Sequence, residues 1–213
     1  GNQISKDLLD FENKKATQLP EHSAIATIWD CNPYATVTKG HMMFAKKKNT
    51  PDAHWINITK IACKKQNTDF DRTVYAFTHV SIGIFESFIS CWHEKYRTNV
   101  IRPETYINLY IDENWRPQLQ TPPFPEYTSG HSTISRAAAE VLTKVYGDNV
   151  AFNDSTEVPY GLPPRKFTSF IQAADEASIS RLYGGIHFRP ALEEGAKQGA
   201  KVGQHLLATV KTR

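Results

Sequence analysis

Hydrophobic residues recur at intervals of three and four along most of the chain, which is the spacing of one face of an α-helix. The longest such segment is predicted over 70–96. Its apolar positions are Val74, Phe77, Val80, Ile84, Phe85, Phe88, Ile89 and Trp92. Because this segment is strongly apolar, we expect it to be the central helix of a bundle.

Shorter helices are predicted before and after it, from apolar periodicity and from residues that favour helix starts. They are expected over 23–30, from Pro51 through Ala62, over 103–116, 131–146 and 165–182, and from Pro190 towards the C-terminus. In the last helix the expected core positions are Leu192, Ala196, Ala200, Val202, Leu206 and Leu207. Residues 3–17 are amphipathic and suit a helix that lies on a larger body.

The sequence shows no pattern that predicts a β-strand. No run of any length alternates with the period of a β-strand, and no internal repeat is found. Residues 33–50 contain Gly, Pro, Thr and Lys without periodicity and are predicted to be a loop. The predicted fold class is therefore all-α, as one helical-bundle domain over residues 1–213.

Length and charge narrow the function classes. The 213 residues can bury a core, and the formal charge of +3 with a pI near 8.7 is mild. The lysine clusters at 46–48 and 64–65 are short, so nucleic-acid binding is not indicated. No apolar run reaches bilayer length, so no membrane span is predicted. The start at Gly1 has neither an initiator Met nor an apolar signal core, as expected of an N-terminus that is processed, tagged or cut from a longer chain.

Three cysteines, Cys31, Cys63 and Cys91, lie in apolar helical contexts. Because the count is odd, buried free thiols are favoured over a disulfide. The cysteines therefore give no indication of the cellular compartment.

The first candidate for chemistry is Ser129-Gly130-His131, where a Pro-rich run turns into an Ala-rich helix. Ser129 can cap this helix, so its free N–H groups and the positive end of its dipole face whatever lies before His131. Such a helix start can bind an anion, with a titratable histidine at the rim. The motif alone is more often just a capped helix.

Three permanent cations and a second histidine lie elsewhere in the chain: Lys95, Arg102, Arg181 and His187. Each can be structural by itself, since Lys and Arg are usually solvated, an Arg can cap helix carbonyls and a histidine can be satisfied in a core. If the four converge, charge repulsion and lost hydration make the cluster unfavourable without an anion. A multiply charged oxyanion is then the natural ligand.

The order and spacing of these residues are specific. Lys95-x6-Arg102-Pro103, then Ser129-Gly130-His131, then Ser180-Arg181-x5-His187 resembles the three-part signature shared by vanadium-dependent haloperoxidases and type-2 phosphatidic acid phosphatases, the superfamily of the bacterial acid phosphatases. The resemblance implies the all-α bundle of that superfamily.

The flanking residues resemble the haloperoxidase branch more than the membrane lipid phosphatases, at Trp92, at 122–127 and at 183–189. The resemblance covers about 25–203 and corresponds to the C-terminal half of the longer haloperoxidases. It therefore implies an N-terminal helical half, or a homo-oligomer, as a partner. It also implies export to the periplasm or the extracellular space.

The resemblance implies a role for each matching residue of the oxyanion site. Lys95, Arg102 and Arg181 would hold the equatorial oxygens of vanadate or phosphate. Ser129 and the amide of Gly130 would add hydrogen bonds.

The two histidines would then carry the chemistry. His187 would supply the axial nitrogen, as the ligand of vanadium in a haloperoxidase or as the nucleophile that forms a phosphohistidine in a phosphatase. His131 would be the acid–base group on the opposite side. Phe124 stands where the family places a residue linked to halide preference, and Asp30 where an acidic residue pairs with Arg181.

Two positions depart from the family pattern. Thr128 stands where the family often has Pro, and Ala191 stands where it usually has an Asp that orients the imidazole of His187. The second departure weakens the case for phosphatase turnover, unless Glu193 or Glu194 takes the place of that Asp.

Three functions follow as alternatives. The first is a vanadium-dependent haloperoxidase, with vanadate as cofactor and with hydrogen peroxide and a halide as substrates. The second is a soluble acid phosphatase that hydrolyses phosphate esters without a cofactor. The third is a domain that binds an oxyanion without turnover.

Overall fold

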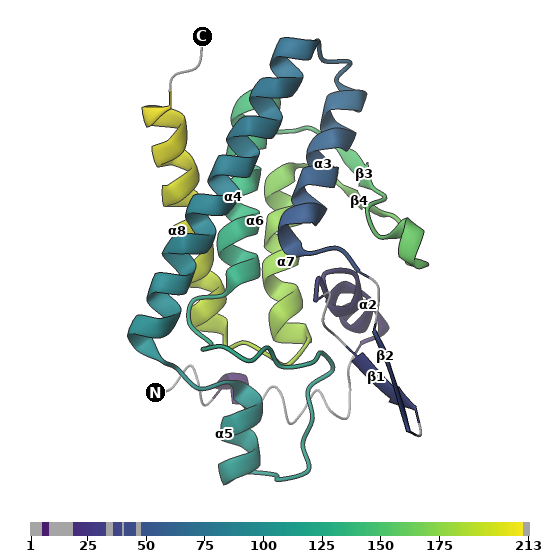
Figure 1. The fold of residues 1–213 in the computed structure, drawn as a ribbon, viewed down its shortest axis with the longest axis vertical. Coiled ribbons are helices and arrows are strands. Elements are labelled where there is room, and N and C mark those ends of the chain that lie inside the picture. Colours follow the sequence, from purple (N-terminus) through teal and green to yellow (C-terminus); the bar gives the residue numbers. More distant parts are fainter. Residues whose placement is uncertain (1–5, 9–18, 33–35, 40, 46–47, 211–213) are drawn as a thin grey trace.

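Helix α6 (Gly130–Tyr146) is the central element of the structure, a computed structural model that describes residues 6–8, 19–32, 36–39, 41–45 and 48–210. Four helices pack on it, namely α3 (Pro51–Lys65), α4 (Phe70–Thr98), α7 (Phe170–Tyr183) and α8 (Arg189–Thr209). They run along the long axis in Figure 1, with α2 (Pro20–Ile28) and α5 (Pro103–Tyr110) towards the lower end. The mostly helical structure confirms the predicted all-α class.

The position of α6 differs from the prediction that the helix over 70–96 would be central. α6 is rich in alanine, and its residues 137–139 are fully buried, so small side chains let neighbouring helices approach from several sides. α4 buries Val80 but leaves Phe70 and Phe85 exposed. Strong apolarity therefore did not identify the central helix, because α4 carries apolar residues on its outer face as well.

The buried face of α8 also differs from the prediction. Gly199 and Gly203 are buried, whereas the predicted core positions Ala196 and Ala200 are only half-buried. A Cβ at Gly199 would overlap the carbonyl oxygen of Thr133 on α6. The glycines therefore allow the backbone of α8 to lie directly against α6.

Capping residues set the helix starts. The side chains of Thr50, Asp69 and Ser129 each accept a hydrogen bond from the backbone N–H three residues further on. Ser169 does the same for Gln172, so α7 begins at Phe170 and not at 165 as predicted.

Two antiparallel hairpins lie outside the prediction. They pair β1 (Thr36–Lys39) with β2 (Met42–Ala45) and β3 (Phe152–Asp154) with β4 (Arg165–Phe167). The predictions of a loop over 33–50 and of a helix from 165 are therefore wrong at these positions. Phe152 lies opposite Phe167, both are buried, and the Phe152 ring stacks on Phe170 at 5.3 Å. Strands of three or four residues are too short to show a clear alternation.

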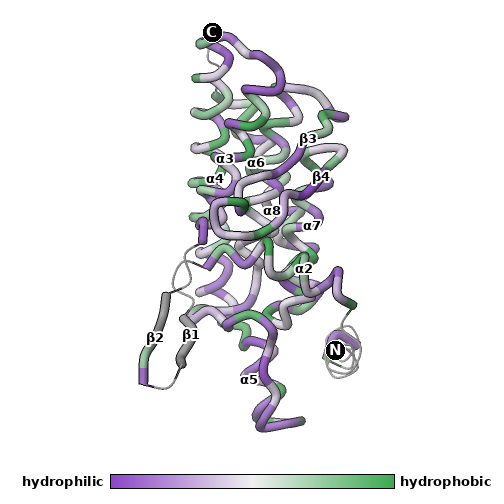
Figure 2. The backbone as a smooth tube through the Cα atoms, turned by 90° about the vertical axis from the view of Figure 1, so that its right-hand side faces the viewer, coloured by the Kyte–Doolittle hydropathy of each residue, from purple (hydrophilic) through white to green (hydrophobic). Residues whose placement is uncertain are grey.

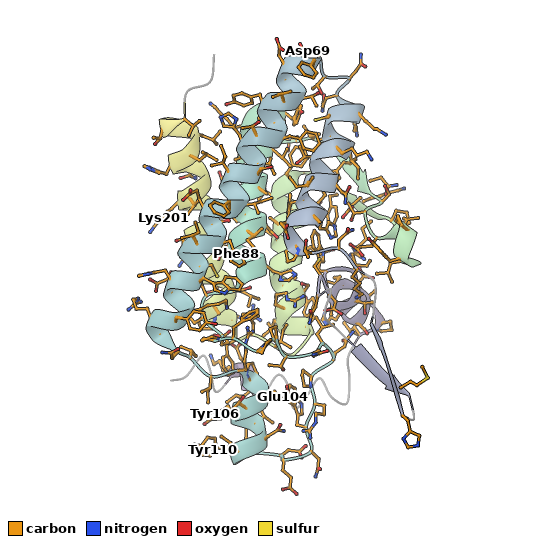
Figure 3. All side chains as sticks on the ribbon, in the orientation of Figure 1. Asp69, Phe88, Glu104, Tyr106, Tyr110 and Lys201 are labelled. Carbon is orange, nitrogen blue, oxygen red and sulfur yellow. The ribbon has the colours of Figure 1, made fainter. Side chains whose placement is uncertain are left out.

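Two other helix boundaries differ from the predicted ones. α2 begins at Pro20, and α5 ends at Tyr110, before the predicted end at 116. The side-chain amide of Asn108 donates to the carbonyl oxygens of Asp112 and Trp115 at 3.0 and 2.9 Å, which turns the chain back after the helix. Figure 3 shows Tyr106 and Tyr110 on α5 at the end of the bundle. Of the helix predicted over 3–17, residues 6–8 are helical and the rest lies outside the described residues.

Hydrophobic and hydrophilic residues alternate along the bundle helices (Figure 2). By length and composition alone, the segment Phe70–Tyr110 is nevertheless apolar enough to span a membrane, which the sequence analysis did not expect of any segment. Core helices meet the same criteria, and this segment includes the helix α4 that packs on α6 and α8. The three cysteines are buried and free, as predicted.

Replacing Gly199 with Ala is expected to lower the free energy of unfolding by about 1–3 kcal/mol, because the new methyl group overpacks the contact with α6. Helix propensity alone predicts the opposite sign, a gain of about 1 kcal/mol. Chemical denaturation measures the change. The control is Lys201→Ala on the exposed side of the same helix (Figure 3), expected to stay within about 0.5 kcal/mol of the wild type. An unchanged or higher value for Gly199→Ala would contradict the close packing.

Candidate active site

A cavity of about 770 Å³ lies between α3, α4 and the N-terminus of α6, and six of the candidate residues line it, whereas Asp30, Lys95, Arg102 and Ser129 lie outside its lining. Its lining includes Trp92, Phe124, Gly130, His131, Arg181 and His187. Apolar side chains of α3 and α4 form much of the remaining wall, including Phe88, which Figure 3 labels on α4. The structure therefore brings together residues that lie almost 100 positions apart in the sequence.

Lys95, near the C-terminal end of α4, is fully buried. Its Nζ donates hydrogen bonds to the carbonyl oxygens of Pro125 at 2.8 Å and Glu126 at 3.0 Å. The ammonium group also lies 5.7 Å from the ring centre of Trp92 and 5.3 Å from that of Phe124. Burial lowers the pKa of Lys95 to about 7, so the free site only weakly retains this charge.

Arg102 is buried at the N-cap of α5. Its Nε donates to the carbonyl oxygen of Phe124, and its Nη1 donates to the carbonyl oxygen of Ile186 and to Nε2 of His187, each at 2.9 Å. Burial lowers the pKa of Arg102 to about 10, against the opposing effect of Glu126. Its Nη2 is buried and has no hydrogen-bond partner within the described part of the chain.

The tautomer of His187 follows from its two neighbours. Arg102 can only donate, so Nε2 of His187 must be the acceptor, and the ring proton must lie on Nδ1. Nδ1 then donates to Oε1 of Glu126 at 2.8 Å, and the same oxygen accepts the N–H of Phe188 at 2.9 Å. Burial and the nearby cations, Arg102 first, hold the pKa of His187 well below its usual value. His187 is therefore a neutral imidazole with its Nε2 lone pair turned towards Arg102.

Glu126 corrects the prediction that Ala191 leaves this imidazole without an orienting acceptor. The carboxylate comes from the Pro-rich loop and not from α8, where Glu193 is exposed and Glu194 pairs with Lys197. Burial raises the pKa of Glu126 to about 7, while the Phe188 N–H opposes that shift.

Sequence reasoning assigned no role to Glu126. The available signal was a lone carboxylate inside the Pro-rich run that leads to Ser129.

Arg181 and His131 meet at the backbone of Trp29. Nη1 of Arg181 donates to the carbonyl oxygen of Trp29 at 2.7 Å, and the ring of His131 makes a backbone hydrogen bond to Trp29. Burial and the charge of Arg181 hold the pKa of His131 well below its usual value, so the ring is neutral. Among the described residues, the ion pair of Asp30 is with Lys48 at 3.1 Å, and Asp30 acts on Arg181 only through its charge. The predicted pairing of Asp30 with Arg181 is thus present as a charge interaction, without an ion-pair contact between the two side chains.

Ser129 and Gly130 begin α6 as predicted. The Ser129 hydroxyl accepts the N–H of Ser132 at 3.3 Å, and the Ser129 N–H donates to the carbonyl oxygen of Ala191 at 3.0 Å. A Cβ at Gly130 would lie 3.4 Å from the Trp92 ring, so the glycine leaves the helix start open to the cavity.

Three buried nitrogen atoms at this end of the bundle have no partner in the described part of the chain: Nη2 of Arg102, Nε of Arg181 and Nε2 of His131. Two belong to permanent cations and can only donate, and unpaired buried donors are unfavourable. No carboxylate forms an ion pair with Lys95, Arg102 or Arg181 among the described residues, although Glu126 lies close by. An oxyanion would supply both the missing acceptors and the missing negative charge.

Comparisons with known proteins find similar sequences and folds. Residues 75–213 match a family described as the VCPO second helical-bundle domain. A solved structure described as the first bacterial vanadium-dependent iodoperoxidase is 54% identical with a TM-score of 0.88, and the match covers 97% of this chain and 48% of that one.

Two bacterial vanadium-dependent chloroperoxidase structures agree in fold alone. The holo-type is 20% identical with a TM-score of 0.70, and the apo-type is 17% identical with a TM-score of 0.71. Each match covers 95% of this chain, and 46% and 48% of the respective structures, so the chain spans about half the length of all three. No curated protein matches the chain.

Removing the carboxylate of Glu126 is expected to weaken binding of inorganic phosphate by about 10–100-fold, because the orientation of His187 is lost. Calorimetry on Glu126→Ala measures the loss. Glu126→Gln keeps an acceptor oxygen and should lose less, and Glu193→Ala, the exposed control on α8, should bind as the wild type does. Equal affinity in Glu126→Ala and the wild type would contradict the orienting role.

Sulfate affinity is expected to fall as the pH rises above 7. Lys95 has a pKa of about 7 in the free site, so above this pH binding of the anion must take up a proton to restore its charge. The dissociation constant should rise by up to about tenfold per pH unit, until the pKa of Lys95 in the complex is passed. Calorimetry at pH 6–9 measures this dependence. Because sulfate remains a dianion throughout this range, any change of affinity with pH reports the titration of protein groups.

The control for this pH dependence is Lys95→Met, which should bind sulfate more weakly at pH 6 and show a smaller dependence above pH 7. An equally steep dependence in the variant would assign the proton to another group.

Proposed function

The chain belongs to the vanadium-dependent haloperoxidase family, and from that premise we propose that it oxidises a halide with hydrogen peroxide at a vanadate held by His187. The observation that carries the proposal is the neutral His187, whose Nε2 lone pair is fixed by the Nδ1 bond to Glu126. In the structure this lone pair accepts from Arg102, whose side chain would turn to an oxygen of the bound oxyanion.

The residues present fit an oxyanion of this kind. The unpartnered nitrogens of Arg102 and Arg181 would donate to its oxygens, and Lys95 would compensate its charge from the other side. Ser129 and the open helix start at Gly130 would add hydrogen bonds. When bound, vanadate would supply a Lewis-acidic centre that activates hydrogen peroxide.

The overall reaction needs a proton as well as two electrons. One halide ion, one hydrogen peroxide molecule and one proton give one hypohalous acid and one water. The halide gives up two electrons, and the peroxide oxygen–oxygen bond breaks as it accepts them. A residue of the cavity must therefore accept and return protons near the peroxide.

His131 suits this role. Its neutral ring is held by the backbone of Trp29, and no described residue forms a hydrogen bond with its buried Nε2. It can accept a proton at Nε2 from an incoming hydrogen peroxide and return it to the leaving oxygen as water forms. Arg181 raises the energy of the protonated ring, which favours return of the proton.

The aromatic wall provides the place for the halide. Phe124 and Trp92 pack together with ring centres 5.0 Å apart, and Lys95 and Arg102 lie near the Phe124 ring, 5.3 and 5.2 Å from its centre. A large, weakly hydrated halide is compatible with an apolar wall backed by positive charge. Iodide is accordingly the first halide to test.

The test loads the protein with vanadate and supplies hydrogen peroxide with iodide, bromide or chloride. Triiodide formation and halogenation of monochlorodimedone report the oxidised halide. His131→Ala should lower the turnover rate by about 10²–10⁴-fold while vanadate still binds. His93→Ala, an exposed histidine on α4, should retain wild-type turnover.

Other outcomes would overturn the proposal. Hydrolysis of p-nitrophenyl phosphate without oxidation of any halide would identify a phosphatase. Vanadate binding with neither activity would identify an oxyanion-binding domain. Equal turnover in His131→Ala and the wild type would remove the proton-transfer role while leaving the proposed activity intact.

A further inference from the structure

A second cluster of metal-ligating side chains lies between α2, α3 and the β3–β4 hairpin. Cys31 follows α2, His54 is in the first turn of α3, and Glu157 follows β3. All three side chains are buried, and one possible ligand atom from each lies within 4.8 Å of the others. None of them is assigned a step in the proposed halide chemistry, although Cys31 also lines the cavity.

The distances within the cluster match those between ligands of one metal ion. Nδ1 of His54 lies 3.5 Å from Sγ of Cys31 and 3.4 Å from Oε1 of Glu157. Around a tetrahedral zinc ion, bond lengths of about 2.3 Å to sulfur and about 2.0–2.1 Å to nitrogen and oxygen give ligand separations of about 3.4–3.6 Å. The imidazole nitrogen therefore already stands at ligand distance from both neighbours.

The other nitrogen of His54 is held by a carboxylate. Nε2 lies 2.7 Å from Oδ2 of Asp154, whose Oδ1 accepts the N–H of Thr156 at 3.0 Å. A carboxylate at this position accepts a hydrogen bond from the proton on Nε2, and the lone pair on Nδ1 is then available to a metal ion. This is the usual arrangement of a metal-bound histidine and its supporting carboxylate.

Glu157 provides the independent observation. Its side chain is 4% exposed, Oε1 accepts from the side-chain amide of Asn49 at 2.9 Å, and the buried Oε2 has no hydrogen-bond partner among the residues that the structure describes. Two carboxylates and a thiol thus surround one imidazole.

We propose that Cys31, His54 and Glu157 bind one divalent transition-metal ion, zinc by ligand chemistry, at a site separate from the oxyanion site. A thiolate, an imidazole and a carboxylate are ligands that zinc accepts together. Cys31 also lines the large cavity, which gives water a route to a fourth coordination position. The thiol and the imidazole would bind as thiolate and neutral ring, with release of protons.

The metal ion would position the oxyanion site. Cys31 is two residues from Trp29, whose carbonyl oxygen holds Arg181 and whose indole stacks on His54 at 4.4 Å. Linking Cys31 to α3 and to the β3–β4 hairpin would fix the backbone at Trp29. The ion would thereby act on Arg181 and His131 without touching substrate.

The experiment uses the whole chain, freed of metal by a chelator and titrated with Co²⁺ and with Zn²⁺. We expect one ion per chain, a thiolate-to-cobalt charge-transfer band, and a rise in the unfolding temperature with Zn²⁺ that the chelator reverses. Zn²⁺ should also protect Cys31 from alkylation, read by mass spectrometry. Cys63→Ala, which removes another buried thiol from α3, should keep the band, and Cys31→Ala should lose it.

The wild-type measurements decide the matter even if Cys31→Ala fails to fold. Absence of a stoichiometric ion, or an unchanged alkylation rate of Cys31 with Zn²⁺ present, would show that the cluster binds no metal ion and would overturn the proposal. A charge-transfer band that survives in folded Cys31→Ala would place the metal at another thiol and overturn the assignment. Lys95→Met should bind Co²⁺ as the wild type does, which separates this site from the oxyanion site.

Discussion

Three cationic side chains are buried at one end of the bundle. The surrounding structure must stabilise their positive charge without water, and this requirement determines most of the local contacts. Lys95, Arg102 and Arg181 direct hydrogen bonds to backbone carbonyl oxygens, and none forms an ion pair with a carboxylate in the described residues. Carbonyl dipoles stabilise a buried cation less fully than water does. The Pro-rich loop therefore directs its carbonyl oxygens towards these cations. Because the carbonyl dipoles compensate the positive charge only in part, the site still favours binding of an anion.

The same constraint explains why a neutral histidine lies among these charges. A protonated His187 would face Arg102 and Lys95 in a medium with little water, so the uncharged ring is favoured. Arg102 then fixes one ring nitrogen as an acceptor, and Glu126 fixes the other as a donor. Electrostatics and hydrogen bonding thus select one protonation state and one tautomer of His187, the residue that we propose to hold the vanadate.

The sequence predicted those features that depend on neighbouring residues or on the order of motifs along the chain. Ser129 as a cap and the long helix from Phe70 follow from residue type and spacing. The grouping of Lys95, Arg102, Arg181 and His187 follows from the resemblance of their order and spacing to the family signature. It did not predict contacts that arise only through folding. Glu126 reaches His187 across 61 positions, and the glycine face of α8 is defined by the backbone of α6. Short hairpins carry too few residues to show their period.

Glu126 comes from the loop, whereas the usual carboxylate would come from the helix after His187, and this has a consequence for protein engineering. Residues 124–129 supply an aromatic wall, carbonyl acceptors for two cations, the partner of the imidazole and the cap of α6. These tasks share one short stretch of backbone, so a substitution that shifts it alters several of them together. A redesign of the cavity at Phe124 is therefore also a redesign of the basicity of His187.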